Sequence, residues 1–122
     1  MNTVFCDDIN EITEQNNFFR RVISTSTTQQ LVVMSLIPGE DIGSEVHPYV
    51  TQFFRIEKGN GLLLIDDQPY CNLQDGSAVV IPPNTRHNII NTSYDQDLKL
   101  YTIYSPPNHP ENRIDAVKPL ED

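Results

Sequence analysis

Short runs of apolar and β-branched residues alternate with turn signals along most of this chain. Each run is five to eight residues long and is bounded by Gly, Pro, Asn, Asp or Ser, as at Lys58-Gly59-Asn60-Gly61. Runs of this length between such residues are typical of β-strands. We therefore predict strands over residues 20–25, 30–37, 52–56, 61–65, 68–72, 77–81, 86–91 and 98–104.

The two ends of the chain break this pattern. Residues 7–19 are acidic and rich in Asn and Gln, which predicts either one short helix or a loop that leads into the sheet. The proline-rich run 105–110 ends the last strand, because proline cannot continue a β-ladder. Many short strands with a turn between each pair indicate an all-β sandwich or barrel. We expect one domain over residues 1–122, with a barrel core of about 20–105 and peripheral segments 1–19 and 106–122.

The charge balance narrows the possible partners. The chain carries 17 acidic and 8 basic residues, for a formal net charge of −9. Such a surface repels phosphate backbones and anionic membranes, so we expect neither nucleic acid nor membrane as a partner. The start of the chain lacks the basic residues and apolar run of a signal peptide, and no apolar stretch reaches membrane-spanning length. A cytoplasmic location is therefore predicted.

Four polar residues near the middle of the chain are candidate metal ligands. Glu45 and His47 are two residues apart, so an extended chain points both to the same face. Pro48 ends that stretch, Gln52 opens the next strand, and His87 opens a later one. In an antiparallel barrel these four side chains can converge inside. The alternative for each residue alone is an ordinary hydrogen-bonded polar side chain, because a Glu-x-His pair is common by chance.

The chemistry of this set suits one borderline divalent ion. Two imidazoles, one carboxylate and one amide oxygen are ligands for Zn, Ni, Fe(II), Mn or Co. Both imidazoles must be neutral to bind, so metal affinity should fall at acid pH. Four protein ligands leave one or two positions open for water or substrate on a five- or six-coordinate ion.

The spacing around the first three candidates resembles a motif of the cupin superfamily. That motif runs Gly, five residues, His-x-His, three or four residues, Glu, six residues, Gly. Here Gly39 is followed by five residues and Glu45-Val46-His47, then by four residues and Gln52, then by six residues and Gly59.

The spacing around His87 resembles the second cupin motif. That motif runs Gly, five residues, Pro-x-Gly, two residues, His, three residues, Asn. Here Gly76 is followed by five residues and Pro82-Pro83-Asn84, then by two residues and His87, then by three residues and Asn91. The resemblance covers residues 39–91 and implies a cupin double-stranded β-helix, or jelly-roll barrel, with a metal held by Glu45, His47, Gln52 and His87.

Three positions depart from the family pattern. Glu45 stands where the first His usually stands, and Gln52 stands where the Glu stands, so the ligand charge remains −1. Asn84 replaces a Gly, which is mild because Asn tolerates the left-handed conformation. The departures at Glu45 and Gln52 imply weaker metal binding and a different metal preference.

The set of one Glu, one Gln and two His also resembles the zinc set of the mannose-6-phosphate isomerases, which are cupins. The runs 39–47 and 104–110 look like those of small single-domain cupins that are often likened to these isomerases. The resemblance implies zinc as the metal and a carbohydrate-like small molecule as the substrate. Arg55 and Arg86 have outward parity, however, so the sequence offers no obvious inward cation for a phosphosugar.

Other residues are candidates for the pocket around the metal. Phe54, Ile56 and Ile89 share parity with the ligands on their strands, so we expect them to line the pocket floor, with plain core packing as the alternative. His109 in the proline-rich run is a candidate acid or base, and a solvated loop histidine is the alternative. Tyr49 in the ligand loop is a candidate to cover the pocket and to act in catalysis, and an exposed loop tyrosine without such a role is the alternative.

One further pair is ambiguous. Tyr101 and Tyr104 have opposite parity on the last strand, so at most one faces the metal, and the sequence leaves open which.

We therefore predict a metal-dependent enzyme that acts on a small oxygenated molecule, a sugar or keto acid, with the metal as Lewis acid for an isomerase-like proton transfer. A non-haem Fe(II) or Ni dioxygenase, a non-enzymatic sugar- or ligand-binding module, and a scaffold with a vestigial site are the alternatives. Cupins often form homodimers through edge strands, and the resemblance implies that residues 20–25 are available for such pairing.

Overall fold

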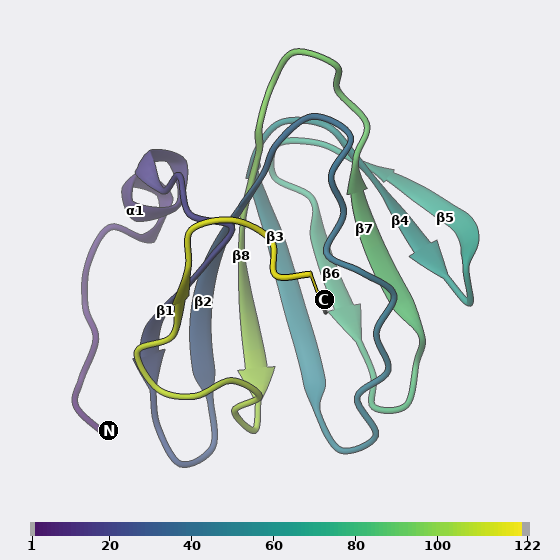
Figure 1. The fold of residues 1–122 in the computed structure, drawn as a ribbon. Helices are drawn as coiled ribbons and strands as arrows, with labels where there is room; N and C mark the ends of the chain where they lie inside the picture. Colours follow the sequence, from purple (N-terminus) through teal and green to yellow (C-terminus); the bar gives the residue numbers. More distant parts are fainter. Residues whose placement is uncertain (1, 121–122) are drawn as a thin grey trace.

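The computed structural model describes residues 2–120 as two facing antiparallel sheets with one short helix (Figure 1). The larger sheet has six strands in the order β6-β3-β8-β2-β1-β9, and the smaller has three in the order β5-β4-β7. The strands and the helix are α1 Ile9–Gln15, β1 Arg20–Thr25, β2 Gln30–Leu36, β3 Thr51–Lys58, β4 Gly61–Ile65, β5 Gln68–Leu73, β6 Ala78–Ile81, β7 His87–Asn91, β8 Leu98–Ser105 and β9 Ile114–Asp115.

The core lies between the two sheets, where one face of each strand points inward. Along β3 buried and half-buried residues alternate, so that Phe54 and Ile56 are fully buried while Arg55 faces outward. Leu100 on β8 and Ile89 on β7 complete the inner layer and are also fully buried. This arrangement confirms the predicted all-β fold, and all eight predicted strands are present.

The segment between β2 and β3 extends the smaller sheet without forming a regular strand. Asp41 is bridged to Ile90, and Glu45 is bridged to His87, both antiparallel to β7. Figure 1 shows this segment running down the open side of the barrel next to β7. The candidate ligands Glu45 and His47 therefore come from a segment that is held by backbone hydrogen bonds.

One glycine is required by close packing. At Gly59 φ is +114°, and a Cβ atom would lie 2.9 Å from the carbonyl oxygen of Asp97. Only glycine fits this turn between β3 and β4 without moving the backbone of the neighbouring segment. The glycine that ends the first motif thus has a packing role.

The N-terminal segment forms the short helix that was one of its two predicted states. Asp8 caps α1 by accepting a hydrogen bond from the Glu11 amide. At the other end of α1, the Lys99 side chain from β8 donates to the Asn16 carbonyl and to Ser35 Oγ. The helix is thereby fixed on the outer face of the larger sheet, away from the candidate ligands.

The C-terminal segment contains a ninth strand that the sequence analysis did not predict. Asp115 and Ile114 pair with Arg20 and Arg21 of β1. Lys118 then forms an ion pair with Asp41, so the segment runs from β1 to the chain beside β7 across the open side of the barrel (Figure 1). A strand of two residues has no periodicity, which is why the pattern did not reveal it. No helix among the described residues is long and apolar enough to cross a membrane.

Candidate metal centre

The backbone places Glu45 directly opposite His87. The amide of each residue donates to the carbonyl of the other, at 2.9 and 3.0 Å. Asn84, in the turn before β7, donates its amide to the His47 carbonyl at 2.8 Å. Asn84 has φ +65°, the left-handed conformation expected where the cupin motif has glycine. The two ligand-bearing segments are thus joined on both sides of the site.

His87 is buried, and its hydrogen bonding fixes its tautomer. Its Nδ1 lies 2.9 Å from the Thr85 carbonyl oxygen, which can only accept, so Nδ1 carries the proton. Burial lowers the pKa of His87 below its usual value, against smaller opposing effects from the Thr85 carbonyl and Glu45. The imidazole is therefore neutral near pH 7, and Nε2 presents a lone pair to the interior.

Gln52 presents a second lone pair to the same point. Its Nε2 donates to Thr102 Oγ1 at 3.0 Å, which turns the amide oxygen toward His87. Gln52 Oε1 then lies 3.0 Å from His87 Nε2. With neutral His87 these two atoms are both acceptors, and a cation between them would satisfy both. Because two acceptor atoms face each other here, the site fits a metal ion.

The two remaining candidates lie beside this pair. Glu45 Oε2 is 2.8 Å from His47 Nε2 and 4.0 Å from His87 Nε2. One ligand atom from each of Glu45, His47 and His87 lies within 4.8 Å of the others, so this group could hold a metal ion. Their side chains are partly exposed at Glu45 and His47 and buried at His87, so the site opens toward the mouth of the barrel. The donor types suit a borderline divalent ion and do not single out one metal.

Tyr104 is the tyrosine of β8 that faces the site. Its ring lies 6.0 Å from that of His47, edge to face, and its side chain is buried. Tyr101 contacts Phe53 instead, with 6.2 Å between ring centroids. The inner face of β8 therefore carries Thr102 and Tyr104, which are two residues apart.

His109 lies beside Tyr104. Its Nε2 is 3.2 Å from the Tyr104 hydroxyl oxygen. Gln30 positions this part of the chain, because its Oε1 accepts from the amides of Asn108 and His109 and its Nε2 donates to the His109 carbonyl. The proline-rich run is thus attached to the inner face of β2, and it brings an imidazole to the tyrosine next to His47.

The other predicted pocket residues fall into two groups. Phe54, Ile56 and Ile89 are fully buried in the core, and the Phe54 ring lies 5.9 Å from that of His87. Tyr49 is 85% exposed in its loop. This exposure agrees with the alternative, an exposed loop tyrosine. Its predicted roles as roof and catalytic residue gain no support from this geometry.

Arg20 is a buried charged residue of the larger sheet that the sequence analysis missed. Only Arg55 and Arg86 were considered as inward cations, yet Arg20 is 2% exposed and lies on β1 in register with the core residue Met34. Its parity with Val22 was the signal that could have revealed it, because Val22 faces the core.

Comparison with known proteins agrees with this fold. The family model of the cupin domain matches residues 32–104. The chain is 48% identical over 120 residues to the uncharacterized protein L612 of Acanthamoeba polyphaga mimivirus, covering 97% of this chain and 75% of L612. It is 47% identical over 123 residues to the uncharacterized protein YrkC of Bacillus subtilis, covering 93% of this chain and 66% of YrkC.

A solved structure is also similar over nearly the whole chain. BH2720 from Bacillus halodurans superimposes with a TM-score of 0.90 at 38% identity, covering 96% of this chain and 92% of BH2720. The likeness to mannose-6-phosphate isomerases is not confirmed by these comparisons. The motif spacing, the two facing sheets and the matched residues agree, and the chain belongs to the cupin family.

Proposed function

We propose that this cupin is a metal-dependent enzyme that transfers a proton within a small oxygenated molecule, a sugar or a keto acid. The observation that carries the proposal is the pair of acceptors, His87 Nε2 and Gln52 Oε1, that face each other at 3.0 Å beside Glu45 and His47. A bound divalent ion would act as a Lewis acid on a carbonyl or hydroxyl oxygen of the substrate.

The Tyr104–His109 pair supports proton transfer rather than binding alone. The Tyr104 hydroxyl and His109 Nε2 are 3.2 Å apart, and the Tyr104 ring lies next to His47. In this proposal His109, through Tyr104, takes the carbon-bound proton from the hydroxyl-bearing carbon next to the carbonyl and returns it to the carbonyl carbon, while the hydroxyl proton moves to the former carbonyl oxygen. Protons balance over the cycle, so no further reactant is required.

Isomerisation of a sugar in the manner of the mannose-6-phosphate isomerases is the finer form of this proposal, and zinc is the metal we expect. The support is the ligand set of one Glu, one Gln and two His. The cytoplasm as location and a homodimer as assembly remain proposals as well. β9 pairs with Arg20 and Arg21 of β1, so the proposed dimer would use the remainder of β1 or another sheet edge such as β5 or β6.

The test combines metal analysis with an exchange assay. Freshly purified protein is expected to contain close to one divalent ion per chain. Incubated in D2O with a panel of sugars and keto acids, it should exchange carbon-bound protons next to the carbonyl. The exchange should be lost in His87→Ala and strongly reduced in His109→Ala. Metal-loaded protein that gives no exchange with any member of the panel would contradict the proposed enzyme.

Dioxygenase chemistry is the second candidate, because Glu45, His47 and His87 supply two imidazoles and one carboxylate. Fe(II)-loaded protein that consumes oxygen with one of the same substrates, without proton exchange, would favour it. A binding module is indicated if ligands bind with unchanged affinity after both His47→Ala and His87→Ala.

A further inference from the structure

Strand β6 forms one edge of the larger sheet and lacks the features that usually protect such an edge. Its residues, Ala78 to Ile81, are all apolar, with no charge, proline or bulge among them. Val80 is 64% exposed, and Ala78 is exposed as well. An uncharged edge strand rich in β-branched residues is a template for pairing with another strand.

The backbone groups of β6 that point to this edge can be identified from its pairing with β3. The Ile56 amide of β3 donates to the Ser77 carbonyl at 2.9 Å, just before β6 begins. Backbone groups alternate between the two sides of a strand, so Val79 faces β3, whereas Ala78 and Val80 turn their amides and carbonyls toward the open edge. Outside the paired strands, no backbone hydrogen bond of the described residues involves Ala78 or Val80.

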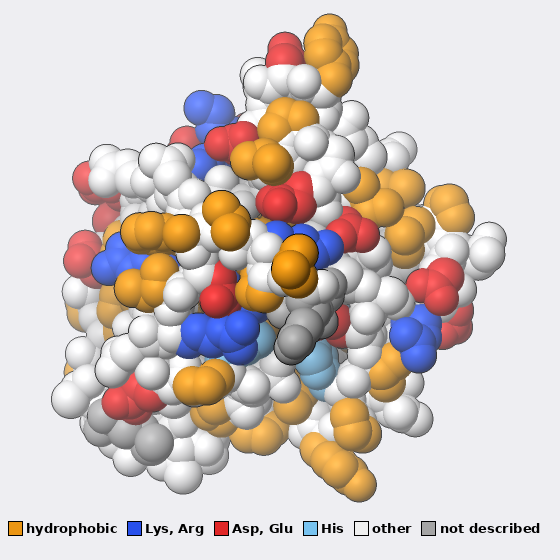
Figure 2. Space-filling view, in the orientation of Figure 1, with side chains coloured by type: hydrophobic (Ala, Val, Ile, Leu, Met, Phe, Trp, Pro, Cys, Tyr) orange, Lys and Arg blue, Asp and Glu red, His pale blue; other side chains and the backbone are white. Residues whose placement is uncertain are grey.

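Both edges of the smaller sheet are protected. Beside β7, Asp41 and Glu45 form bridges to that strand and cover its edge. At the other edge, β5 contains Pro69, and its register with β4 shifts between Leu63 and Leu64. Proline and such irregularities both hinder the addition of a further strand. Figure 2 also shows acidic side chains over the turn that joins β4 and β5.

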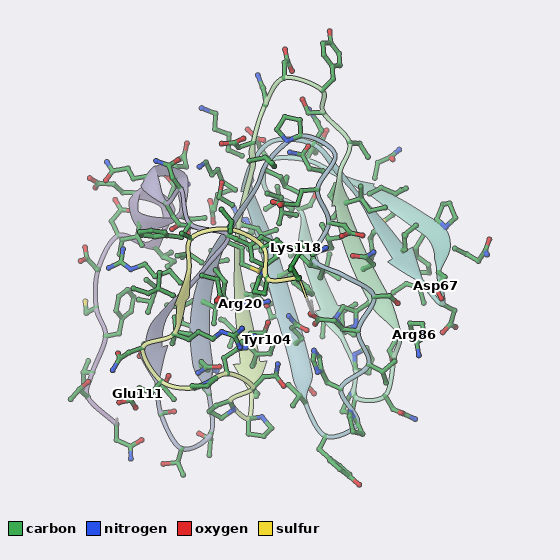
Figure 3. All side chains as sticks on the ribbon, in the orientation of Figure 1. Arg20, Asp67, Arg86, Tyr104, Glu111 and Lys118 are labelled. Carbon is green, nitrogen blue, oxygen red and sulfur yellow. The ribbon has the colours of Figure 1, made fainter. Side chains whose placement is uncertain are left out.

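The far edge of the larger sheet is occupied by other parts of the same chain. β9 pairs with the first two residues of β1. Further along β1, the Val22 amide donates to the Arg113 carbonyl at 2.9 Å, and the Asn2 amide donates to the Thr25 carbonyl at 3.2 Å. Figure 3 shows Glu111 where the C-terminal segment turns alongside β1. Among the described residues, β6 is therefore the edge that remains open.

An apolar hollow lies next to this open edge, between β6 and the smaller sheet. Its volume is about 370 Å³, and its lining includes Leu63, Ile65, Val79, Ile81, Tyr70 and Cys71. Tyr70, on β5, is 70% exposed. A strand added to β6 would continue the larger sheet beside this hollow and cover both Tyr70 and Val80.

We infer that two copies of this chain associate by antiparallel pairing of β6 with β6 of the second copy, about a two-fold axis at Val79. Ala78 of each copy then lies opposite Val80 of the other, and each pair exchanges both backbone hydrogen bonds. Two identical antiparallel strands form a self-complementary interface of this kind. This inference assigns one edge to the proposed homodimer and does not depend on the metal chemistry.

The charge distribution favours a second copy at this edge. Two chains that each carry a net charge of −9 repel one another over most of their surfaces. Residues 76–85, which contain β6 and both of its flanking turns, include no charged side chain. The edge of β6 is therefore a place where two copies approach with little repulsion.

The test is sedimentation equilibrium of the full chain over a range of protein concentrations. The wild type should be a dimer. Val80→Pro should be a monomer, because it removes an amide that points to the open edge and leaves the pairing with β3 in place. Val80→Thr is the matched control, since it keeps that amide and a side chain of similar shape, and it should remain a dimer.

A cross-linking variant tests the inference if Val80→Pro does not fold. Val79→Cys, combined with Cys6→Ser and Cys71→Ser, places two thiols across the two-fold axis. They lie in a non-hydrogen-bonded pair with Cα atoms about 4.5 Å apart, within the range of a disulfide. Oxidised glutathione should therefore convert this variant to a covalent dimer. Val80→Cys in the same background is its control and should cross-link much less, because residue 80 faces Ala78 of the other copy.

Three results would overturn the inference. The first is a wild type that is a monomer at every concentration, which would leave β6 open to an extended peptide of another protein. The second is a folded Val80→Pro variant that still forms the dimer. The third is cross-linking of Val79→Cys that is no greater than that of Val80→Cys.

The dimer and the proposed enzyme fail in different ways. A wild-type dimer that β6 variants disrupt, in protein that binds no divalent ion, would support this interface and contradict the enzyme. A monomer that binds a divalent ion and exchanges carbon-bound protons would do the reverse.

Discussion

At the scale of single residues, the candidate metal site depends on a side chain that does not touch the metal position. Thr102 Oγ1 accepts from Gln52 Nε2, and this bond turns the amide oxygen toward His87. Outer contacts of this kind contribute about 10–100-fold to metal affinity. Thr102→Val removes the hydroxyl at constant shape, so zinc affinity should fall by roughly that factor.

The measurement is a zinc titration against a competing chelator. Thr51→Val is the matched control, since Thr51 precedes Gln52 on β3 and points to the opposite face, and its affinity should equal that of the wild type. Equal affinities in both variants would show that Gln52 is not held by Thr102, or is not a ligand.

The candidate ligands were identified from the sequence because the motif spacing marks them, including His87 at the start of β7 and Gln52 as the second residue of β3. Arg20, Thr102 and Gln30 were not, since each acts through a partner far along the chain. Gln30 holds the segment around His109, which is 79 residues away. A polar residue in an apolar strand gives no sign of its partner until the sheets are paired.

At the scale of elements, the segment 113–118 connects the two sheets over the mouth of the barrel. Its ion pair joins Lys118 to Asp41. Burial would raise the pKa of Asp41, but the hydrogen bonds from Lys118 and Asn88 together lower it below its usual value. A carboxyl with a lowered folded-state pKa stabilises the fold above pH 3.8, and this contribution is lost as the pH falls through the folded-state pKa.

Lys118→Met should therefore release this segment. We expect faster amide hydrogen exchange over residues 113–118 at pH 7, with a local destabilisation of up to about 1 kcal/mol because the pair is partly exposed. The difference from the wild type should shrink as the pH falls below 3.8 and through the lowered folded-state pKa of Asp41. Lys58→Met, a change at an exposed lysine, is the control, and equal exchange in both variants would contradict the role of the ion pair.

The docking of α1 gives a prediction of the same sign at a higher pH. Lys99 Nζ donates to the Asn16 carbonyl, to Asn17 Oδ1 and to Ser35 Oγ. Burial lowers the pKa of Lys99 below 10.5, against an opposing effect of Asp97. Between the folded-state pKa and 10.5 the unfolded chain binds more protons, so the Lys99 contribution to stability increases as the pH rises.

Lys99→Met should remove this contribution and cost roughly 1–3 kcal/mol at pH 7, because buried acceptors lose their donor. Urea unfolding of both proteins from pH 7 to pH 10.5 measures the effect. The stability difference between them should widen with pH, and parallel curves would show that Lys99 does not titrate in this range.

At the scale of the whole molecule, the candidate ligands come from both sheets. Gln52 belongs to the larger sheet, whereas His87 and the bridged Glu45 belong to the smaller one. A bound ion would thus link the two sheets in addition to the contacts that core packing provides. The sequence predicted both layers from their periodic strands. It did not predict β9, whose place depends on charge pairs between distant segments.

Metal binding should therefore stabilise the entire fold. An ion that binds only the folded chain adds about 2.7 kcal/mol at a free concentration 100 times Kd. For a domain of this size that raises Tm by roughly 8–16 °C. Thermal unfolding with zinc and with chelator measures the shift, which His87→Ala should abolish and His109→Ala should retain, because His109 contacts Tyr104 rather than the ligand cluster. An equal shift in both histidine variants would place the zinc outside this site, and no shift in the wild type would remove the metal from the proposed function.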